Sequence, residues 1–139
     1  MRGVHNIYKV MRIFKAARTN FIDLLNLDTG TQDKVFDDSS VVSDYTFEFM
    51  QEGGVYHCKI ELFGDFDRTK TKKSVEVTII DSNAIIGKRE YFKVLIGSDV
   101  YYILKSDAKG FELKRKMYYS FTRKDLLQVN DVIHADCLK

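Results

Sequence analysis

The chain of 139 residues contains no proline and only two cysteines. The absence of proline excludes polyproline recognition segments and rigid proline linkers. Cys58 and Cys137 are far apart in the sequence and form no CxxC pair, so neither a disulfide framework nor a zinc site is predicted. We therefore expect two reduced thiols and a cytoplasmic protein.

Long apolar runs are missing as well. Polar residues at His5, Asn6, Lys9 and Arg12 interrupt the first 14 residues, so they lack the apolar stretch of a signal peptide, and no run approaches the length of a membrane span. Apolar residues still make up 45% of the chain, with 10 Phe and 8 Tyr. This is enough to bury one core, and we expect a single domain over residues 1–139.

The net charge is only +2, which argues against a protein that coats nucleic acid through bulk charge. The charges are nevertheless separated along the chain. Acidic residues dominate between Leu27 and Glu52, and basic residues dominate between Lys105 and Lys124. The folded surface should therefore be polarised.

Apolar residues near both termini recur at a spacing of three to four, which is typical of one face of a helix. At the N-terminus these residues are Ile7, Val10, Met11, Phe14, Ala17, Phe21, Leu24 and Leu25. At the C-terminus Thr122 and Asp125 resemble a capping box, and Leu126, Val129, Ile133 and Cys137 follow on one helical face. The sequence predicts helices over residues 5–26 and 123–137.

Between these segments the pattern changes to a period of two, which is typical of β-strands. A loop over 27–43 comes first. Strands are predicted over 45–49, 56–62, 75–79, 89–96, 99–105 and 111–121. The predicted fold is α+β, with an N-terminal helix, a six-stranded antiparallel meander and a C-terminal helix. The meander is expected as an open sheet or as a partly closed barrel.

Catalytic motifs are absent from the sequence. There is no GxxxxGK[ST], GxSxG, HExxH, GxGxxG or EF-hand loop. His57 and Cys58 are adjacent on a predicted strand, so their side chains should point to opposite faces and form no catalytic dyad. These observations favour a protein that is not an enzyme, and no cofactor is predicted.

Two acidic patterns leave a metal-dependent nuclease open as an alternative. Glu112-Leu113-Lys114 is an acid-x-Lys element that would hold a divalent ion together with Asp99 in such a nuclease, although an element of this kind is expected about twice by chance. Asp65 and Asp67 alternate on an extended segment, but the lysines that follow would oppose a bound cation. We expect this segment to be a solvated loop.

The strongest functional feature is one face of the predicted sheet, where tyrosines alternate with lysines. The candidate binding residues on this face are His57, Lys59, Tyr91, Lys93, Tyr101, Lys105, Lys114, Lys116 and Tyr118. Such a face would bind an acidic protein surface, since tyrosine is enriched in interface cores, or stack the bases of a nucleic acid. A solvated sheet face, or one covered by a helix, is the alternative without function.

The sequence therefore predicts a small non-catalytic protein that binds another macromolecule through this face. The first hypothesis is a protein partner, with inhibition of that partner as one outcome of binding. Nucleic acid on the same face is the second, and a metal-dependent nuclease is the third.

Overall fold

The computed structural model describes residues 6–17, 19–42, 46–108, 110 and 113–139, and their regular structure is almost entirely β-strand. The strands are β1 (Ile7–Ala16), β2 (Thr19–Asn26), β3 (Gln32–Asp37), β4 (Val55–Asp67), β5 (Val75–Ile86), β6 (Arg89–Ile96), β7 (Asp99–Leu104), β8 (Lys116–Val129) and β9 (Val132–Ile133). The helices are single turns, α1 (Ser39–Val42) and the 3₁₀ helices η1 (Lys105–Ala108) and η2 (Ala135–Leu138). None of the helices in the described ranges is long and apolar enough to cross a membrane.

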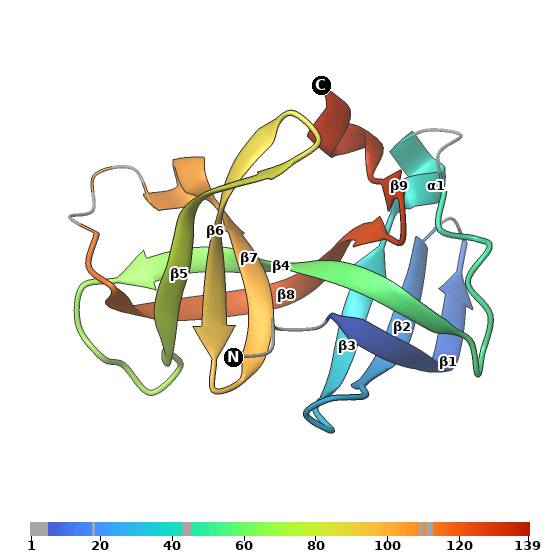
Figure 1. Ribbon diagram of the computed structural model, residues 1–139, viewed down its shortest axis with the longest axis horizontal. Coiled ribbons are helices and arrows are strands. Elements are labelled where there is room, and N and C mark those ends of the chain that lie inside the picture. The colour runs from blue at the N-terminus through green and yellow to red at the C-terminus, as the bar shows by residue number, and fades with distance from the viewer. Residues whose placement is uncertain (1–5, 18, 43–45, 109, 111–112) are drawn as a thin grey trace.

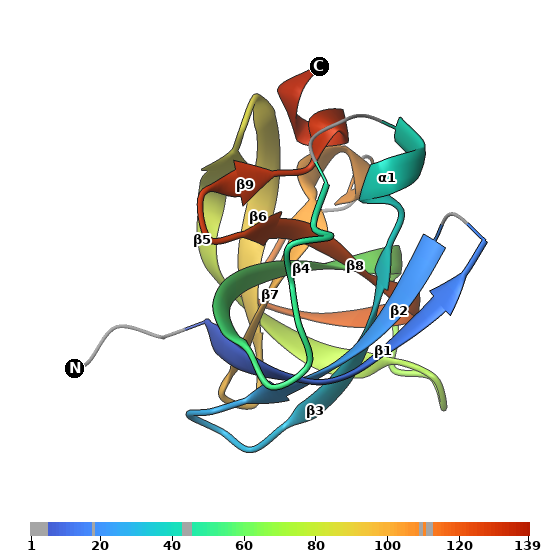
Figure 2. The same ribbon diagram turned by 90° about the vertical axis from the view of Figure 1, so that its right-hand side faces the viewer.

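Two long strands, β4 and β8, form an antiparallel ribbon that runs through the molecule (Figure 1). Along one half of the ribbon, β4 pairs with β1, β1 with β2 and β2 with β3, and a parallel bridge between Phe36 and Asp125 joins β3 to β8. We call these five strands the first ring. Figure 2 looks onto this ring and shows α1 and the C-terminal residues at one end of it.

The other half of the ribbon completes a second ring. Here β8 pairs with β5, β5 with β6 and β6 with β7, and a parallel bridge between Glu61 and Tyr102 joins β7 to β4. The two rings therefore share the β4–β8 ribbon, and each is closed by a single parallel bridge. These two closures are the shortest ladders between strands in the described part of the chain.

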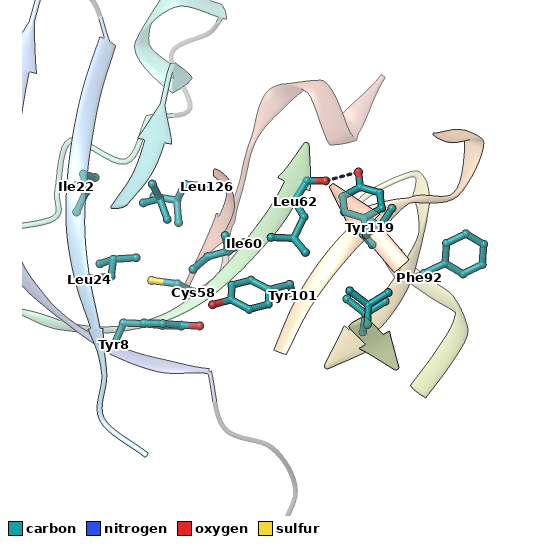
Figure 3. Packing of buried hydrophobic residues seen from close by; sticks show 14 of the residues in the cluster. Tyr8, Ile22, Leu24, Cys58, Ile60, Leu62, Phe92, Tyr101, Tyr119 and Leu126 are labelled. Carbon is teal, nitrogen blue, oxygen red and sulfur yellow. Dashed lines mark hydrogen bonds between the residues drawn. The ribbon is translucent and has the colours of Figure 1, made fainter. Parts of the chain in front are cut away.

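One hydrophobic cluster extends through both rings (Figure 3). Alternate ribbon residues Cys58, Ile60 and Leu62 point inward and contact the interior of both rings. The hydroxyl of Tyr119 donates to the Leu62 carbonyl at 3.1 Å, so its polar atom is satisfied inside this core. A second, smaller cluster includes Tyr91, Tyr102, Leu127 and Cys137 and places η2 against the second ring.

The predicted N-terminal helix over 5–26 is wrong, because this segment forms the hairpin of β1 and β2. Tyr8 and Val10 are buried, but the register shifts between Val10 and Arg12, and the partly buried Ile13 is then the next residue facing the core. A β-bulge inserts one extra residue and so changes the phase of the strand. The bulge in β1 therefore makes the spacing between the core-facing positions Val10 and Ile13 three residues instead of two, and this spacing resembles that of a helix.

The predicted C-terminal helix over 123–137 is also wrong, since β8 continues to Val129. A register shift opposite Lys59 and Ile60 leaves Leu127 as an extra residue, so Leu126 belongs to the first cluster and Leu127 to the second. The chain then reverses at Asn130, whose φ is 51°, into β9. A bulge followed by a tight turn again produced the helical spacing.

The six-stranded meander does not describe the sheet either, which has nine strands and includes parallel pairings. Residues 46–49 are not a strand, and Tyr45 lies outside the described residues. The first residues of β4 pair instead with β1, and the predicted loop over 27–43 contains β3 and α1. The predicted hairpin of 89–96 and 99–105 is confirmed as β6 and β7.

Candidate functional site

The nine predicted binding residues do not form one surface. Tyr91 and Tyr101 are 0% and 2% exposed and lie in the two different hydrophobic clusters. The register explains this separation: Tyr91 and Lys93 pair with Leu104 and Tyr102, whereas Tyr101 pairs with Val94. The side chain of Tyr101 is thus on the opposite face from Tyr91, and the predicted phase of β7 was wrong by one residue.

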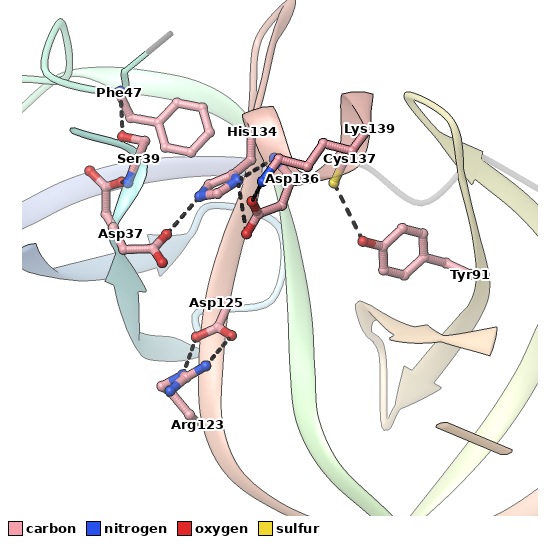
Figure 4. A network of polar contacts seen from close by, with 11 residues as sticks. Asp37, Ser39, Phe47, Tyr91, Arg123, Asp125, His134, Asp136, Cys137 and Lys139 are labelled. Carbon is pink, nitrogen blue, oxygen red and sulfur yellow. Dashed lines mark hydrogen bonds and ion pairs between the residues drawn. The ribbon is translucent and has the colours of Figure 1, made fainter. Parts of the chain in front are cut away.

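The two buried tyrosines have internal partners. Tyr101 donates to Oδ2 of Asp33 at 2.6 Å, and Lys124 binds the other oxygen of the same carboxylate. The Tyr91 hydroxyl lies 3.4 Å from Sγ of Cys137 (Figure 4). Their hydroxyls are therefore engaged inside the protein, and neither ring is available to a partner.

The remaining predicted residues lie in several places. Lys59 has its Nζ 5.9 Å from the Tyr102 ring, and burial followed by the charge of Lys93 lowers the pKa of Lys59. His57 is exposed, and its backbone N–H donates to the Asn130 side chain. Lys105 lines a groove on the second ring, and Lys114, Lys116 and Tyr118 gather where β8 begins.

Neither cysteine is suited to nucleophilic catalysis. Burial raises the pKa of the Cys58 thiol to about 12. Burial also raises the pKa of Cys137, and the hydrogen bond with Tyr91 offsets only part of that increase. A thiol that stays protonated is a poor nucleophile. His57 is exposed while Cys58 is 2% exposed, as expected for neighbours on a strand, so the two side chains form no dyad.

The buried His134 has no ring nitrogen free to activate a hydroxyl. Its Nδ1 accepts the backbone N–H of Asp136 at 3.1 Å, and its Nε2 lies 2.6 Å from Asp38 (Figure 4). The Nδ1 bond places the proton on Nε2, which donates to the Asp38 carboxylate. This histidine anchors η2 to the segment before α1 and is a structural residue.

The acidic residues considered for a nuclease have other neighbours. Asp67 accepts a hydrogen bond from the Ser120 hydroxyl at 2.5 Å, and Asp99 accepts hydrogen bonds from Thr29 and Thr31. Glu112 lies outside the described residues. Within the part of the chain that is described, no three His, Cys, Asp or Glu side chains are grouped to hold a metal ion.

Glu61 is the most perturbed carboxyl group, and it lies where the two rings meet. Its backbone pairs with Tyr102 of β7 and with Asp125 of β8. Burial raises the pKa of Glu61 to about 7, and the carboxylates of Asp125 and Asp107 add to this shift against the opposing effect of two arginines. The carboxyl group is therefore partly protonated near neutral pH.

A row of exposed phenylalanines crosses the outside of the first ring. Phe14 pairs with Phe21, and Phe21 pairs with Phe36, whose ring centroid is 5.4 Å away. The guanidinium of Arg123 continues the row, since its Cζ lies 5.0 Å from the Phe36 ring and 4.7 Å from the Phe63 ring. We call Phe14, Phe21, Phe36, Arg123 and Phe63 the phenylalanine row.

The row is accessible and is held in a fixed geometry. Phe14, Phe21 and Phe63 are 38%, 38% and 47% exposed. The Arg123 guanidinium forms a bidentate contact with Asp125, at 2.5 and 3.0 Å. Apolar rings and an oriented arginine thus occupy a contiguous part of the sheet exterior.

A line of charged residues on neighbouring strands lies beside the phenylalanine row. Arg12 pairs with Asp23, and Asp23 pairs with Lys34 on the next strand. Arg12 Cζ and Lys34 Nζ both lie 4.9 Å from the centroid of the Phe14 ring. The phenylalanine row therefore has a positive border on this side, with one carboxylate between the two cations.

The second ring has a different surface, which we call the basic end. It consists of Arg68, Lys70, Lys72, Lys73, Lys114, Arg115 and Lys116, all of them exposed. The β4–β5 loop that carries the first four is attached at Asp67 and Val75, which pair with Tyr118 and Tyr119 just after the last three. Figure 1 shows this loop and the start of β8 at the end of the molecule away from the first ring.

These cations are largely uncompensated. Leaving Arg68 aside, none of them forms an ion pair with another described residue. Among the described residues, the exposed carboxylates nearest to them in sequence are Asp65 and Glu76. Clustered like charges of this kind produce a positive potential at the surface, so the basic end is suited to an anionic ligand.

A groove of about 840 Å³ opens on the same ring. Phe92, Leu104, Ala108 and Leu113 provide its apolar lining. Its charged residues are Lys88, Arg89, Glu90 and Lys105. Lys105 donates to the Asn83 side chain at 2.9 Å and lies 3.9 Å from Glu90. The volume is within the range of ligand sites, and cations outnumber carboxylates around an apolar floor.

The phenylalanine row was missed by sequence reasoning. Phe14 and Phe21 were assigned to a helix, and Phe36 was assigned to a loop. Nothing in the local pattern marks these residues as neighbours, because only the register of β1, β2 and β3 brings them together. The basic end was found in part, since Lys114 and Lys116 belong to the basic C-terminal segment.

Comparison of the chain with protein-family models, with curated proteins and with solved structures finds no significant match.

Proposed function

We propose that this protein is a non-catalytic binding protein whose partner is another protein, contacted by the phenylalanine row on the outside of the first ring. The observation that carries the proposal is that four phenylalanines and one arginine from five neighbouring strands form a contiguous row, in which Phe36 is half-buried and the other four residues are exposed. This surface replaces the predicted Tyr/Lys face as the site of contact.

The composition of the row favours a protein partner. Interface cores are enriched in aromatic residues and arginine and depleted in lysine. Binding energy concentrates in a few such residues near the centre of the contact, and Arg123 lies between two aromatic rings there. The positive border formed by Arg12 and Lys34 complements a partner with an apolar centre and acidic side chains around it.

The row is also rigid before binding, which reduces the entropy lost on association. Each phenylalanine belongs to a paired strand, and Asp125 orients the guanidinium. If the partner is an enzyme and its functional surface is covered, this protein would act as its inhibitor.

Site-specific photo-crosslinking tests the proposal. A photoreactive phenylalanine analogue at position 21 should capture one protein from an extract of the native host. The same analogue at Ile85, which is 65% exposed on β5, is the matched control and should not capture that protein. With the purified partner, Phe63→Ser should weaken binding at least about tenfold, as expected for an aromatic residue that carries much of the binding energy, and Ile85→Ser should leave binding unchanged.

Equal capture at both positions would contradict the proposal. So would unchanged affinity of the Phe63→Ser variant, provided that its thermal unfolding shows an intact fold. An activity assay of the captured protein, with and without the intact chain, then decides whether binding inhibits it.

A further inference from the structure

We propose that the basic end and the groove of the second ring together bind single-stranded nucleic acid, with phosphates at the lysines and arginines and bases against the apolar lining of the groove. This site lies on the other ring from the phenylalanine row. The proposal does not depend on the proposed protein contact, and the two can fail separately.

Charge is the first argument. Seven exposed cations from two segments meet at the basic end, and six of them have no ion-pair partner among the described residues. Binding of a phosphate backbone to such a cluster releases condensed counterions, which is the main source of affinity in sequence-independent recognition. The net charge of the chain is only +2, and seven of its 22 lysines and arginines lie at this end.

The type of cation is the second argument. Five of the seven are lysines, namely Lys70, Lys72, Lys73, Lys114 and Lys116. Lysine is depleted in the cores of protein interfaces, but it serves as a point charge for phosphate. The basic end therefore fits a nucleic acid backbone better than it fits an acidic protein.

The groove is the third argument, and it selects single strands. Leu113 lines the groove and directly precedes Lys114 of the basic end, so the two features meet in the chain. The groove adds Lys88, Arg89 and Lys105 around its apolar floor. Unpaired bases offer apolar faces to such a floor, whereas a duplex keeps its bases stacked inside and offers only phosphates.

Fluorescence anisotropy with a labelled 20-nucleotide oligothymidylate, and with a duplex of the same length, tests the proposal. The single strand should bind more tightly than the duplex, and its affinity should fall steeply as salt rises from 50 to 200 mM. Lys114→Glu combined with Lys116→Glu should weaken binding about tenfold at 50 mM salt and reduce the salt dependence. Lys9→Glu combined with Lys15→Glu makes the same charge change on exposed residues of β1 and should have little effect.

A second variant separates the groove from the charges. Leu113→Ser removes an apolar lining residue without changing any charge, so it should weaken single-strand binding several-fold and leave duplex binding unchanged. Poly-glutamate at equal charge concentration should compete poorly with the oligonucleotide.

Several results would overturn the proposal. Absence of binding at 50 mM salt would reject the site altogether. An equal loss in the two charge-reversed variants would show non-specific attraction instead of a site. Duplex binding as tight as single-strand binding, or full competition by poly-glutamate, would reject single-stranded nucleic acid as the ligand.

Discussion

The two rings share the β4–β8 ribbon but carry opposite kinds of surface. The first ring has phenylalanines and one arginine on the outside of its sheet, and the second ring has a lysine-rich end and a groove. Aromatic rings and arginine suit a desolvated contact with protein, whereas lysines that remain hydrated suit phosphate. The ribbon takes part in both surfaces, since Phe63 and Arg123 belong to the phenylalanine row and Lys116, at the start of β8, belongs to the basic end.

The largest effect is expected at the ribbon itself, because both rings depend on it. A Cβ added at Gly64 would lie 1.9 Å from the Ser120 carbonyl oxygen and 2.6 Å from the Phe121 Cα, both of them backbone atoms. Gly64→Ala should therefore destabilise the protein by about 3 kcal/mol or more, measured by chemical denaturation.

Gly97→Ala is the matched control for this substitution. Gly97 has φ +59° and no neighbouring atom within 4 Å of an added Cβ, so only backbone strain should count, at about 1 kcal/mol. Loss of one ring with retention of the other in the Gly64→Ala variant, seen as two unfolding transitions, would show that the rings are less coupled than the shared ribbon implies.

The junction between the rings should weaken as Glu61 ionises. The pKa of Glu61 is raised from 4.5 to about 7 in the folded protein, so the folded state binds the proton more tightly than the unfolded state does. The associated stability is fully present below about pH 4.5 and is lost as the pH rises through 7. Relative to Glu61→Gln, the wild type should lose about 2–3 kcal/mol between pH 4.5 and pH 8.

Denaturation of both proteins across this pH range measures the difference. Groups other than Glu61 titrate in both proteins and cancel in the comparison. A difference that does not vary with pH would show that this carboxyl group titrates normally and has no part in coupling the rings.

A buried polar contact ties the inside of the first ring to the second. Tyr101 on β7 donates to Asp33 on β3, and Lys124 on β8 holds the same carboxylate. Tyr101→Phe should cost about 1–2 kcal/mol, because it removes a donor to a buried charged acceptor. Tyr56→Phe, which removes an exposed hydroxyl bonded to the Gln51 N–H, should cost less in the same denaturation assay. Equal costs would contradict a special role for the buried contact.

The smallest effect on stability is expected at the basic end. Lys72→Glu combined with Lys73→Glu changes two exposed loop residues that have no ion-pair partners among the described residues. The free energy of unfolding should change by less than about 0.5 kcal/mol at 150 mM salt. A large loss in thermal denaturation would mean that these lysines stabilise the second ring and are not a free surface.

The hairpin of β6 and β7 was predictable from the sequence, and the terminal strands were not. These two strands are short apolar segments on either side of the Gly97-Ser98 turn and pair without a register shift, so the hairpin was visible. Residues 100–103 are all buried, however, so no alternation marked the phase of β7. Bulges shift the register in β1 between Val10 and Arg12 and in β8 at Leu127, opposite Lys59 and Ile60 of β4. A β-bulge is a property of two paired strands, so the sequence of one strand does not show it. The spacing of the apolar residues was therefore interpreted as helical.

The candidate surfaces also differ in whether the sequence could predict them. Lys114 and Lys116 were identified because a run of basic residues is a property of the chain. The phenylalanine row was not, because Phe14, Phe36 and Phe63 become neighbours only through strand pairing. Tyr91 and Tyr101 were placed on one exposed face but are buried on opposite faces, since one residue of phase reverses every side chain of a strand.

By itself, the sequence determined that the chain has ample apolar material for a core, two separated thiols and a basic C-terminal segment, because composition and local charge do not depend on folding. Tertiary structure alone decided which residues meet: the two rings, the buried Asp33 contact and the phenylalanine row all come from pairings between distant segments. Such pairings are fixed by the register of the β4–β8 ribbon and its neighbours, and register is a property of two strands together.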